Sequence, residues 1–287
     1  MKEFTLDARD SLPLSCAVWE APNAAATLMI VHGLKGHKER FYDFAAAMQR
    51  AGFTVFLSDL RGHGASVNEE FPLGHMDGWE MILDDLTRLC RFARQSCGEP
   101  LYLFAHSFGS VLARLALLRG TLQPDKLILA GALPDDKEIP RLLPLLQLYG
   151  KMKGRKTASA LLQKLGGQKD LSWVNADPAV LENMKKDPLC NGVLTIGAYE
   201  TFCDSIRALS DPSALSHPQR DLPILFISGK LDPKTGGKKG LSRSTRYLRD
   251  AGYQTIRHMV YPNLKHETVN SLDKETVWAD IAAFLKE

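Results

Sequence analysis

The sequence predicts an α/β protein with a mostly parallel, doubly wound sheet and an inserted helical cap, and two observations support this. From residue 27 to residue 130, short apolar runs alternate with segments of helical spacing, which is typical of βαβ units in a sheet covered on both faces. The alternation then stops and resumes near residue 223. Since 45% of the 287 residues are hydrophobic, the chain is long enough for one large core with an insertion. We therefore expect a core of residues 1–133 and 219–287 and a helical insertion of residues 134–218.

The expected strands are continuous apolar runs, as in the buried strands of parallel sheets. In chain order they are residues 27–31, 53–57, 101–104, 126–130, 223–229 and 255–261. The expected helices carry apolar residues three and four apart, and Gly52 follows the first of them as a C-cap. The core helices are residues 40–50, 79–92, a helix that begins after Ser107, 241–251 and 274–285. The short helices of the helical insertion are residues 139–149, 157–165, 178–185 and 193–209, separated by Pro and Gly.

Ser107 is the most informative residue of the chain. The apolar strand before it ends abruptly at Ala105 and His106, and a helical pattern begins directly after Gly109. A serine on a sharp strand-to-helix turn is how one fold type presents a nucleophile. A serine before a helix is otherwise an N-cap, but the preceding strand and the flanking His106 and Gly109 favour the nucleophile. The turn therefore predicts a serine hydrolase, which also needs a base, an orienting acid and an oxyanion hole.

The base and the acid are expected on two later loops. A serine nucleophile needs a His to take its proton and a carboxylate to hold that His in the right tautomer. In this kind of fold the order along the chain is Ser, then Asp or Glu, then His. Asp232 follows the expected strand 223–229, and His266 follows the expected strand 255–261. Because the carboxyl ends of parallel strands meet at one edge of a sheet, we expect Ser107, Asp232 and His266 to form a catalytic triad there.

The oxyanion of a tetrahedral intermediate needs hydrogen-bond donors that are already in place. One expected donor is the backbone N–H of Phe108, the residue after the nucleophile. The other is the N–H of Leu34, in the loop after the first apolar strand, where Gly33 lets the backbone approach closely. Two interpretations of His32 stay open: it orients this loop, or it only satisfies local backbone groups.

Other polar residues near the strand ends are expected to be structural. The loop of residues 61–64, Arg-Gly-His-Gly, carries polar groups that can bond to the loop backbone. His37, His75, His217 and His258 are expected on the surface or in loops.

Together, these segments resemble the α/β-hydrolase superfamily, and within it the monoacylglycerol lipase and lysophospholipase-like branch, which is also grouped with serine aminopeptidase-like hydrolases. The resemblance covers nearly the whole chain and implies the α/β-hydrolase fold. It also implies catalytic roles for Ser107, Asp232 and His266 and oxyanion-hole roles for Leu34 and Phe108, as expected from the residues. The segments that carry it are residues 31–34, 59–66, 105–109, 187–190, 228–233 and 261–267.

The chain departs from the family pattern at one position of the turn. Ala105 stands where the usual first Gly of this turn would be. The turn needs a small side chain, and Ala is the next smallest, so we expect the turn to form. The nucleophile is Ser rather than Asp, which argues against the epoxide hydrolase and dehalogenase relatives.

Composition excludes several other classes of protein. The formal net charge of +3 is too small to argue for a nucleic-acid partner. The five cysteines show no metal-binding spacing, so we expect free thiols of a reducing cytosol and neither a metal nor a cofactor. Residues 1–7 lack the apolar segment of a signal peptide, and no apolar run approaches the roughly 20 residues of a membrane span. We therefore expect a cytoplasmic protein.

The helical insertion bears on the substrate. A helix of residues 139–149 would be apolar on almost all sides. Two interpretations fit: these residues form an acyl-chain pocket or a lipid-facing lid, or they simply pack on the core. The basic run 151–156 fits either a solvated charged loop or transient contact with anionic headgroups at a membrane surface. We expect an ester or lipid substrate of the monoacylglycerol or lysophospholipid type, cleaved through an acyl-enzyme on Ser107.

Two other functions fit the same residues. An amidase, an aminopeptidase or a thioesterase would use the same triad. A non-catalytic binding protein of the same fold is the third possibility, and the complete triad argues against it.

Overall fold

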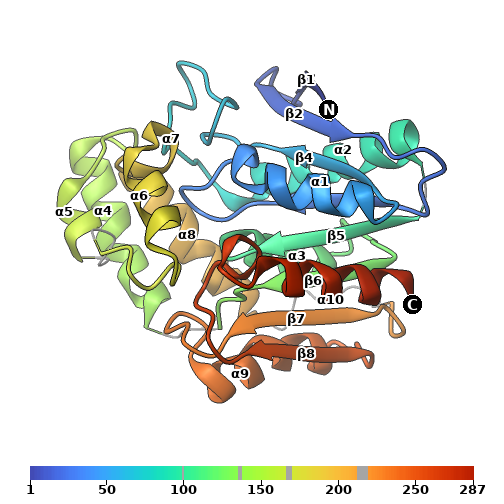
Figure 1. Ribbon diagram of the computed structural model, residues 1–287. Coiled ribbons are helices and arrows are strands. Elements are labelled where there is room, and N and C mark those ends of the chain that lie inside the picture. Colours follow the sequence, from blue (N-terminus) through green and yellow to red (C-terminus); the bar gives the residue numbers. More distant parts are fainter. Residues whose placement is uncertain (99, 135–137, 166–169, 212–218) are drawn as a thin grey trace.

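A computed structural model describes residues 1–287 except residues 99, 135–137, 166–169 and 212–218 (Figure 1). The described residues form an eight-stranded sheet in the order β1-β2-β4-β3-β5-β6-β7-β8. The strands are β1 Lys2–Asp7, β2 Pro13–Trp19, β3 Thr27–Val31, β4 Thr54–Ser58, β5 Leu101–His106, β6 Lys126–Ala130, β7 Ile224–Gly229 and β8 Ile256–Tyr261.

The sheet is mostly parallel, as the sequence predicts. Strands β3 to β8 pair in parallel, and they are the strands expected from continuous apolar runs. Strand β1 pairs antiparallel with β2, and β2 pairs antiparallel with β4, and neither strand was predicted. The residues of β1 alternate between exposed and half-buried positions, which is typical of a strand with one solvated face and leaves no continuous apolar run.

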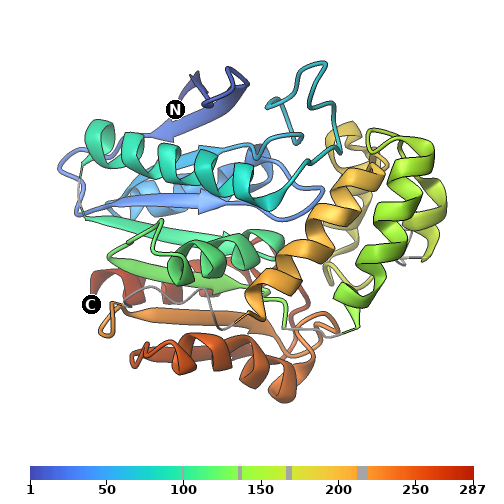
Figure 2. The ribbon, with the colours of Figure 1, turned by 180° about the vertical axis from the view of Figure 1, so that it is seen from behind.

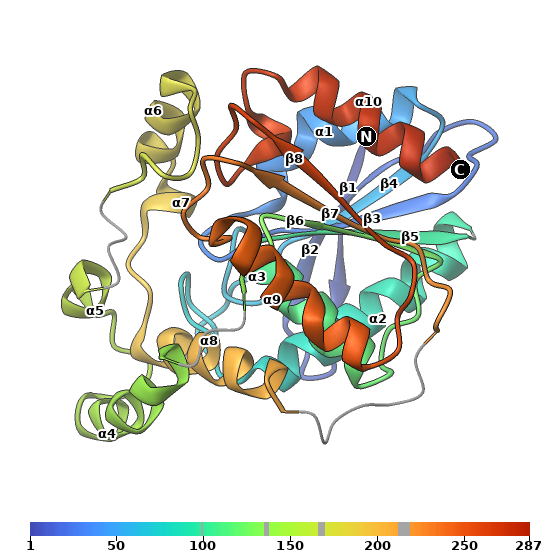
Figure 3. The ribbon, with the colours of Figure 1, turned by 90° about the horizontal axis from the view of Figure 1, so that it is seen from below.

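Helices cover both faces of the sheet (Figure 3), so the doubly wound arrangement is confirmed. On one face, α1 and α10 bury Phe44 and Ile281; on the other, α2, α3 and α9 bury Ile82, Val111 and Leu248. Helices α2 and α9 are longer than predicted, and a 3-10 turn, η1, precedes α1. The bounds are η1 Lys38–Phe41, α1 Tyr42–Arg50, α2 Trp79–Cys97, α3 Phe108–Leu118, α9 Gly237–Asp250 and α10 Lys274–Lys286.

The described part of the helical insertion lies against one end of the sheet (Figures 1 and 2). Helix α8 packs against α2 and α3 of the core and against α4. It begins later than the predicted residue 193 because the Thr195 hydroxyl accepts a hydrogen bond from the Ala198 N–H and caps the helix. The short helix α7 was not predicted. The bounds are η2 Ile139–Leu142, α4 Leu143–Lys153, α5 Ala160–Leu165, α6 Pro178–Lys186, α7 Pro188–Asn191 and α8 Ile196–Leu209.

Helix α4 shows how the apolar run of residues 139–149 is used. Its Leu143 and Leu146 are buried, and they pack in a small cluster with Tyr199, Phe202 and Cys203 of α8. Other large apolar side chains of η2, α4 and α5 are exposed. We refer to them together as the exposed apolar face; they are Leu142, Leu145, Leu148, Met152, Leu161 and Leu165, each more than half exposed. Packing against α8, within the insertion, therefore explains part of the apolar run, and the rest faces solvent.

Two further features bear on the expectations from composition. No helix in the described part of the chain combines the length and the apolar character that crossing a membrane requires. The five cysteines are free thiols, and four of them are buried.

Candidate active site

Ser107 lies at a sharp turn between β5 and α3, and its backbone is strained. Its φ of 53° and ψ of −117° lie in a region that residues other than Gly rarely adopt, at a cost of about 1–3 kcal/mol. Hydrogen bonds hold the turn on both sides. The Ser107 N–H donates to the Ala130 carbonyl of β6 (2.9 Å), and the Ser107 carbonyl accepts from the Ser110 hydroxyl (2.6 Å).

Small residues let the neighbouring backbone come close to this turn. A Cβ atom on Gly33 would lie 2.8 Å from the Ser107 Cβ, and one on Gly109 would lie 2.7 Å from the Val31 carbonyl oxygen. Ala105, the departure from the family pattern, is fully buried in β5, where it pairs with Val31 of β3 and Leu129 of β6. The turn therefore forms with Ala at this position, as expected.

The structure brings the three expected triad residues together. The His266 Nε2 atom lies 2.8 Å from the Ser107 Oγ, and the His266 Nδ1 atom lies 2.7 Å from the Asp232 Oδ2. A neutral imidazole fits both bonds when Nδ1–H donates to the carboxylate and Nε2 accepts from the hydroxyl. His266 and Asp232 are almost fully buried, at 2% and 3% exposure, so solvent competes little for these bonds.

The two residues expected to supply the oxyanion donors lie next to the serine turn. Phe108 is the first residue of α3, and the contact between Gly33 and Ser107 brings the loop that carries Leu34 against the turn. Neither the Leu34 N–H nor the Phe108 N–H donates to an acceptor in the described part of the chain. Two backbone donors beside a serine hydroxyl are what an oxyanion hole requires.

His32 connects two core loops. Its Nε2 accepts a hydrogen bond from the Leu60 N–H (2.9 Å), and its Nδ1 lies 2.8 Å from the Gly33 carbonyl, to which it donates in the same tautomer. Burial and the neighbouring His63 hold the pKa of His32 well below its usual value, which keeps the ring neutral. Both bonds go to backbone groups, and they also connect the Gly33–Leu34 loop to the loop after β4, so both interpretations of His32 stay open.

The loop after β4 is structural, as expected. Asp59 accepts hydrogen bonds from the backbone N–H groups of Lys38 (2.6 Å) and Ala65 (2.9 Å). The Arg61 guanidinium forms ion pairs with Asp85 and Asp10, at 2.6 and 2.8 Å. These bonds tie the loop to its neighbours.

His37 and His75 lie in loops, as expected, but both are buried. His37 and His75 are 4% and 1% exposed. The His37 Nε2 lies 2.7 Å from the Asp187 Oδ2, and the His75 Nδ1 lies 2.8 Å from the Thr195 hydroxyl, so both histidines connect core loops to the helical insertion. His258 is exposed on β8, and His217 lies outside the described residues.

Sequence reasoning missed two features next to His266. Arg40 and Glu267 form a buried ion pair with two hydrogen bonds, one of 3.3 Å between Nε and Oε1. Burial raises the pKa of Glu267, but Arg40 outweighs this and holds it below the usual value. The Trp173 indole lies against the His266 imidazole, with ring centroids 4.9 Å apart. Glu267 directly follows His266 in a segment of the family resemblance, whereas no sequence pattern distinguishes Trp173.

One group of possible metal ligands lies in the described part of the chain. His37, Asp187 and Cys190 place their ligand atoms within 4.8 Å of one another. Burial raises the pKa of the Cys190 thiol to about 12, and the Arg40 Nη1 lies 4.0 Å from its sulfur. A protonated thiol beside a guanidinium is a poor site for a cation, because metal binding requires a thiolate.

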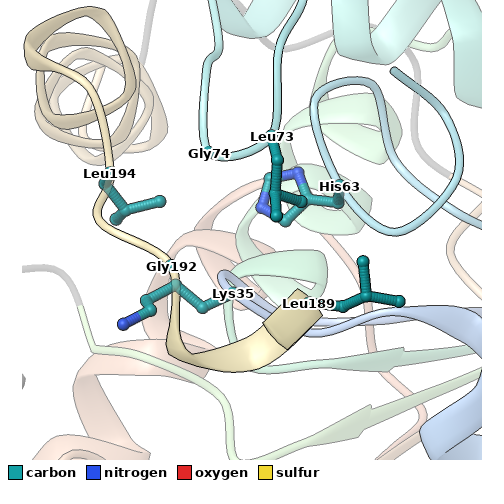
Figure 4. A pocket seen from close by; sticks show the side chains of 7 residues that line it. All are labelled: Lys35, His63, Leu73, Gly74, Leu189, Gly192 and Leu194. Carbon is teal, nitrogen blue, oxygen red and sulfur yellow. The ribbon is translucent and has the colours of Figure 1, made fainter. Parts of the chain in front are cut away.

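A small pocket, with a cavity volume of about 10 Å³, lies where the helical insertion meets the core loops (Figure 4). Lys35, the residue after Leu34, borders it, and burial holds the pKa of this lysine below its usual value. Leucines line both sides. The lining residues are Lys35, His63, Leu73 and Gly74 of the core and Leu189, Gly192 and Leu194 of the helical insertion.

Curated relatives are similar over most of the chain. A putative monoglyceride lipase of Schizosaccharomyces pombe is 26% identical over 272 residues, which are 88% of this chain and 67% of the relative. A monoacylglycerol lipase of Mycolicibacterium smegmatis is 23% identical over 90% of this chain and 87% of its own length. An uncharacterized abhydrolase domain-containing protein of Dictyostelium discoideum is 25% identical over 97% of this chain, but the match spans only 28% of that longer protein.

Solved structures share the fold. A thermostable carboxyl esterase from Bacillus coagulans matches with a TM-score of 0.86 at 22% identity, over 99% of this chain and 97% of that one. A soluble variant of the monoglyceride lipase of Saccharomyces cerevisiae matches with a TM-score of 0.79 at 18% identity, over 99% and 94%. These matches confirm the α/β-hydrolase fold. The family model described as serine aminopeptidase, S33, matches residues 22–273, so the chain belongs to the serine aminopeptidase S33 family of hydrolases.

Proposed function

We propose that the protein is a serine carboxylic-ester hydrolase that acts through an acyl-enzyme on Ser107. The observation that carries this proposal is the hydrogen-bonded chain from the Ser107 hydroxyl through His266 to Asp232. Such a chain activates a hydroxyl that is a weak nucleophile by itself.

In the first half of the reaction, the Ser107 Oγ attacks the ester carbonyl carbon while the hydroxyl proton moves to the His266 Nε2. Asp232 stabilises the imidazolium that forms. The bond from the carbonyl carbon to the alcohol oxygen then breaks, and His266 gives its proton to the leaving alcohol. The N–H groups of Leu34 and Phe108 stabilise the negative oxygen of the tetrahedral intermediate, a contribution worth about 3–4 kcal/mol per donor in comparable sites.

In the second half, water takes the place of the alcohol. His266 accepts a proton from the water, whose oxygen attacks the acyl carbon. The bond to the Ser107 Oγ breaks, and the serine regains its proton from His266. The products are a carboxylic acid and an alcohol, and the protein returns to its starting state.

We further propose that the substrate is an ester of the monoacylglycerol or lysophospholipid type. The names of the S. pombe and M. smegmatis relatives support this class. The exposed apolar face also supports it, since leucines in water favour contact with acyl chains or a lipid surface. In this proposal residues 134–218 are a cap over the site, and the nearby Lys151 and Lys153 would meet anionic headgroups.

A fluorophosphonate probe tests the catalytic mechanism directly. We expect the purified protein to be labelled at Ser107 and the Ser107→Ala variant to stay unlabelled. Equal labelling of the two proteins, or no labelling of the wild type, would contradict the proposal.

Rates on a series of p-nitrophenyl esters test the substrate class. We expect kcat/KM to rise with acyl-chain length and the Ser107→Ala variant to be inactive on the whole series. The family description, a serine aminopeptidase, favours peptide-bond hydrolysis as the second candidate function. Faster cleavage of aminoacyl anilides than of any ester would establish that alternative.

A further inference from the structure

Residues 172–175 of the helical insertion lie against the loop that carries His266. The Glu267 N–H, next to His266 in the chain, donates a hydrogen bond to the Val174 carbonyl (2.9 Å). On the other side of His266, the Lys265 Nζ donates to the Ser172 carbonyl (2.6 Å). Both chain neighbours of the proposed base are therefore bonded to the same short stretch of the insertion.

Asn175 extends this contact with all of its amide group. Its Nδ2 donates to the carbonyls of Glu267 (3.4 Å) and Asn270 (3.1 Å), and its Oδ1 accepts from the Asp177 N–H (2.9 Å). Asn175 is 1% exposed, so water cannot replace these bonds when the side chain is removed. The amide thus holds the backbone on the C-terminal side of His266 in one conformation.

Trp173 contacts the imidazole itself. Its indole lies on the His266 ring with centroids 4.9 Å apart and planes at 59°, and the His106 ring, 5.0 Å away, also contacts the imidazole. The Lys234 ammonium lies 4.9 Å from the indole centroid, and this cation–π contact fixes Trp173 in turn. His266 therefore lies between an element of the core and a side chain of the helical insertion.

We propose that Trp173 and Asn175 are positioning residues for His266, so that the helical insertion holds the base of the triad in its reactive orientation. The imidazole must face Asp232 with Nδ1 and Ser107 with Nε2 at the same time, and a displacement of about 1 Å costs on the order of 100-fold in rate. The inference rests on the proposed function, since it concerns the same His266. It differs from a purely structural role, in which the contacts would only attach the insertion to the core.

Four variants separate these roles with a short ester, p-nitrophenyl acetate, as the substrate. Trp173→Leu keeps apolar bulk but removes the aromatic ring, and Trp173→Phe keeps a ring. Asn175→Ala removes the buried amide. Asn191→Ala is the matched control, because the Asn191 amide also donates to a backbone carbonyl, that of Lys185, but within the insertion.

We expect kcat to fall about tenfold in Trp173→Leu and in Asn175→Ala, with KM within about twofold of the wild type. Trp173→Phe should recover most of the lost kcat, and Asn191→Ala should match the wild type. In the wild type, proton NMR should show a deshielded signal for the proton between the His266 Nδ1 and the Asp232 Oδ2. This signal should broaden or disappear in the two slow variants.

A change confined to KM or to the melting temperature, with kcat and the NMR signal unchanged, would overturn the inference. If Asn175→Ala does not fold, the kcat of Trp173→Leu compared with that of Trp173→Phe is sufficient to test the positioning role. Probe labelling of the wild type keeps the two proposals apart. An unlabelled wild type contradicts the proposed function, whereas a labelled wild type with unchanged kcat in the Trp173 and Asn175 variants contradicts only the positioning role.

Discussion

The sheet core and the helical insertion are stabilised in different ways. Every residue of β3, β4 and β7 is buried, and apolar side chains fill both faces. Helix α8 of the insertion joins this core through buried apolar residues such as Ile206 and Leu209. The outer helices have only a small apolar cluster around Leu143 and Leu146, and polar contacts such as His37 with Asp187 and His75 with Thr195 add to the attachment. The core and α8 therefore depend on packing volume, whereas the rest of the insertion depends more on individual hydrogen bonds and charges.

The largest effect on stability is expected from a cavity in the sheet. Phe226 of β7 is fully buried, so Phe226→Ala should lower the free energy of unfolding by about 3–5 kcal/mol. Chemical denaturation measures this loss. A loss below about 1 kcal/mol would show that the core does not depend on volume at this position, and the comparison with the insertion would fail.

A smaller energetic effect, but a specific one, is expected at Gly33. A Cβ there would lie 2.8 Å from the Ser107 Cβ and 3.2 Å from the His106 Nδ1, so Gly33→Ala should displace the serine and lower kcat/KM about 100-fold. Gly52→Ala is the control, since its Cβ would meet nothing within 4 Å although its φ is +99°. The control should lose only stability, about 1 kcal/mol. Equal activity of the two variants would contradict the close approach at Gly33.

In the insertion, the same kind of cavity should cost less. Leu146 is 7% exposed and packs in the small cluster with α8, so Leu146→Ala should lower the free energy of unfolding by about 2 kcal/mol, at the low end for leucine. The same denaturation experiment gives the value. If the loss equals that of Phe226→Ala, the insertion is as tightly packed as the sheet.

The smallest effect is expected at a polar contact, and it depends on pH. Burial raises the pKa of Asp187, but hydrogen bonds from His37 and the Leu189 N–H outweigh this and hold it below its usual value. Its stabilisation is therefore present above about pH 4 and is lost as the pH falls through the lowered pKa. Asp187→Asn should cost under about 1 kcal/mol at pH 7. The difference from the wild type should shrink below pH 4, and a constant difference across this range would contradict the role of the charge.

The parallel part of the sheet was predictable because buried strands leave continuous apolar runs in the sequence. Strands β1 and β2 were not predicted. Strand β1 lies at the edge of the sheet, and its residues alternate between exposed and half-buried positions, so it leaves no continuous apolar run. Helix ends were less predictable because local contacts set them, as the Thr195 cap does for α8.

The positions of Ser107, Asp232 and His266 followed from strand ends and chain order, since a parallel sheet brings such positions to one edge. Their catalytic roles stay predictions. The contacts of Trp173 and Asn175 were not predictable, because a single Trp or Asn in a segment without strand or helix periodicity carries no information about its partner. The burial of His37 and His75 was missed for the same reason: their partners lie more than a hundred residues away in the chain.

The positive φ of Ser107 has a consequence for natural variation at this position. Glycine adopts such a backbone without steric cost, so Ser107→Gly relieves strain of the order of 1–3 kcal/mol while it removes the proposed nucleophile. At this residue, stability and the proposed catalytic activity therefore favour different side chains. In the proposed mechanism, the hydroxyl of Ser107 comes at the expense of the stability that glycine would provide.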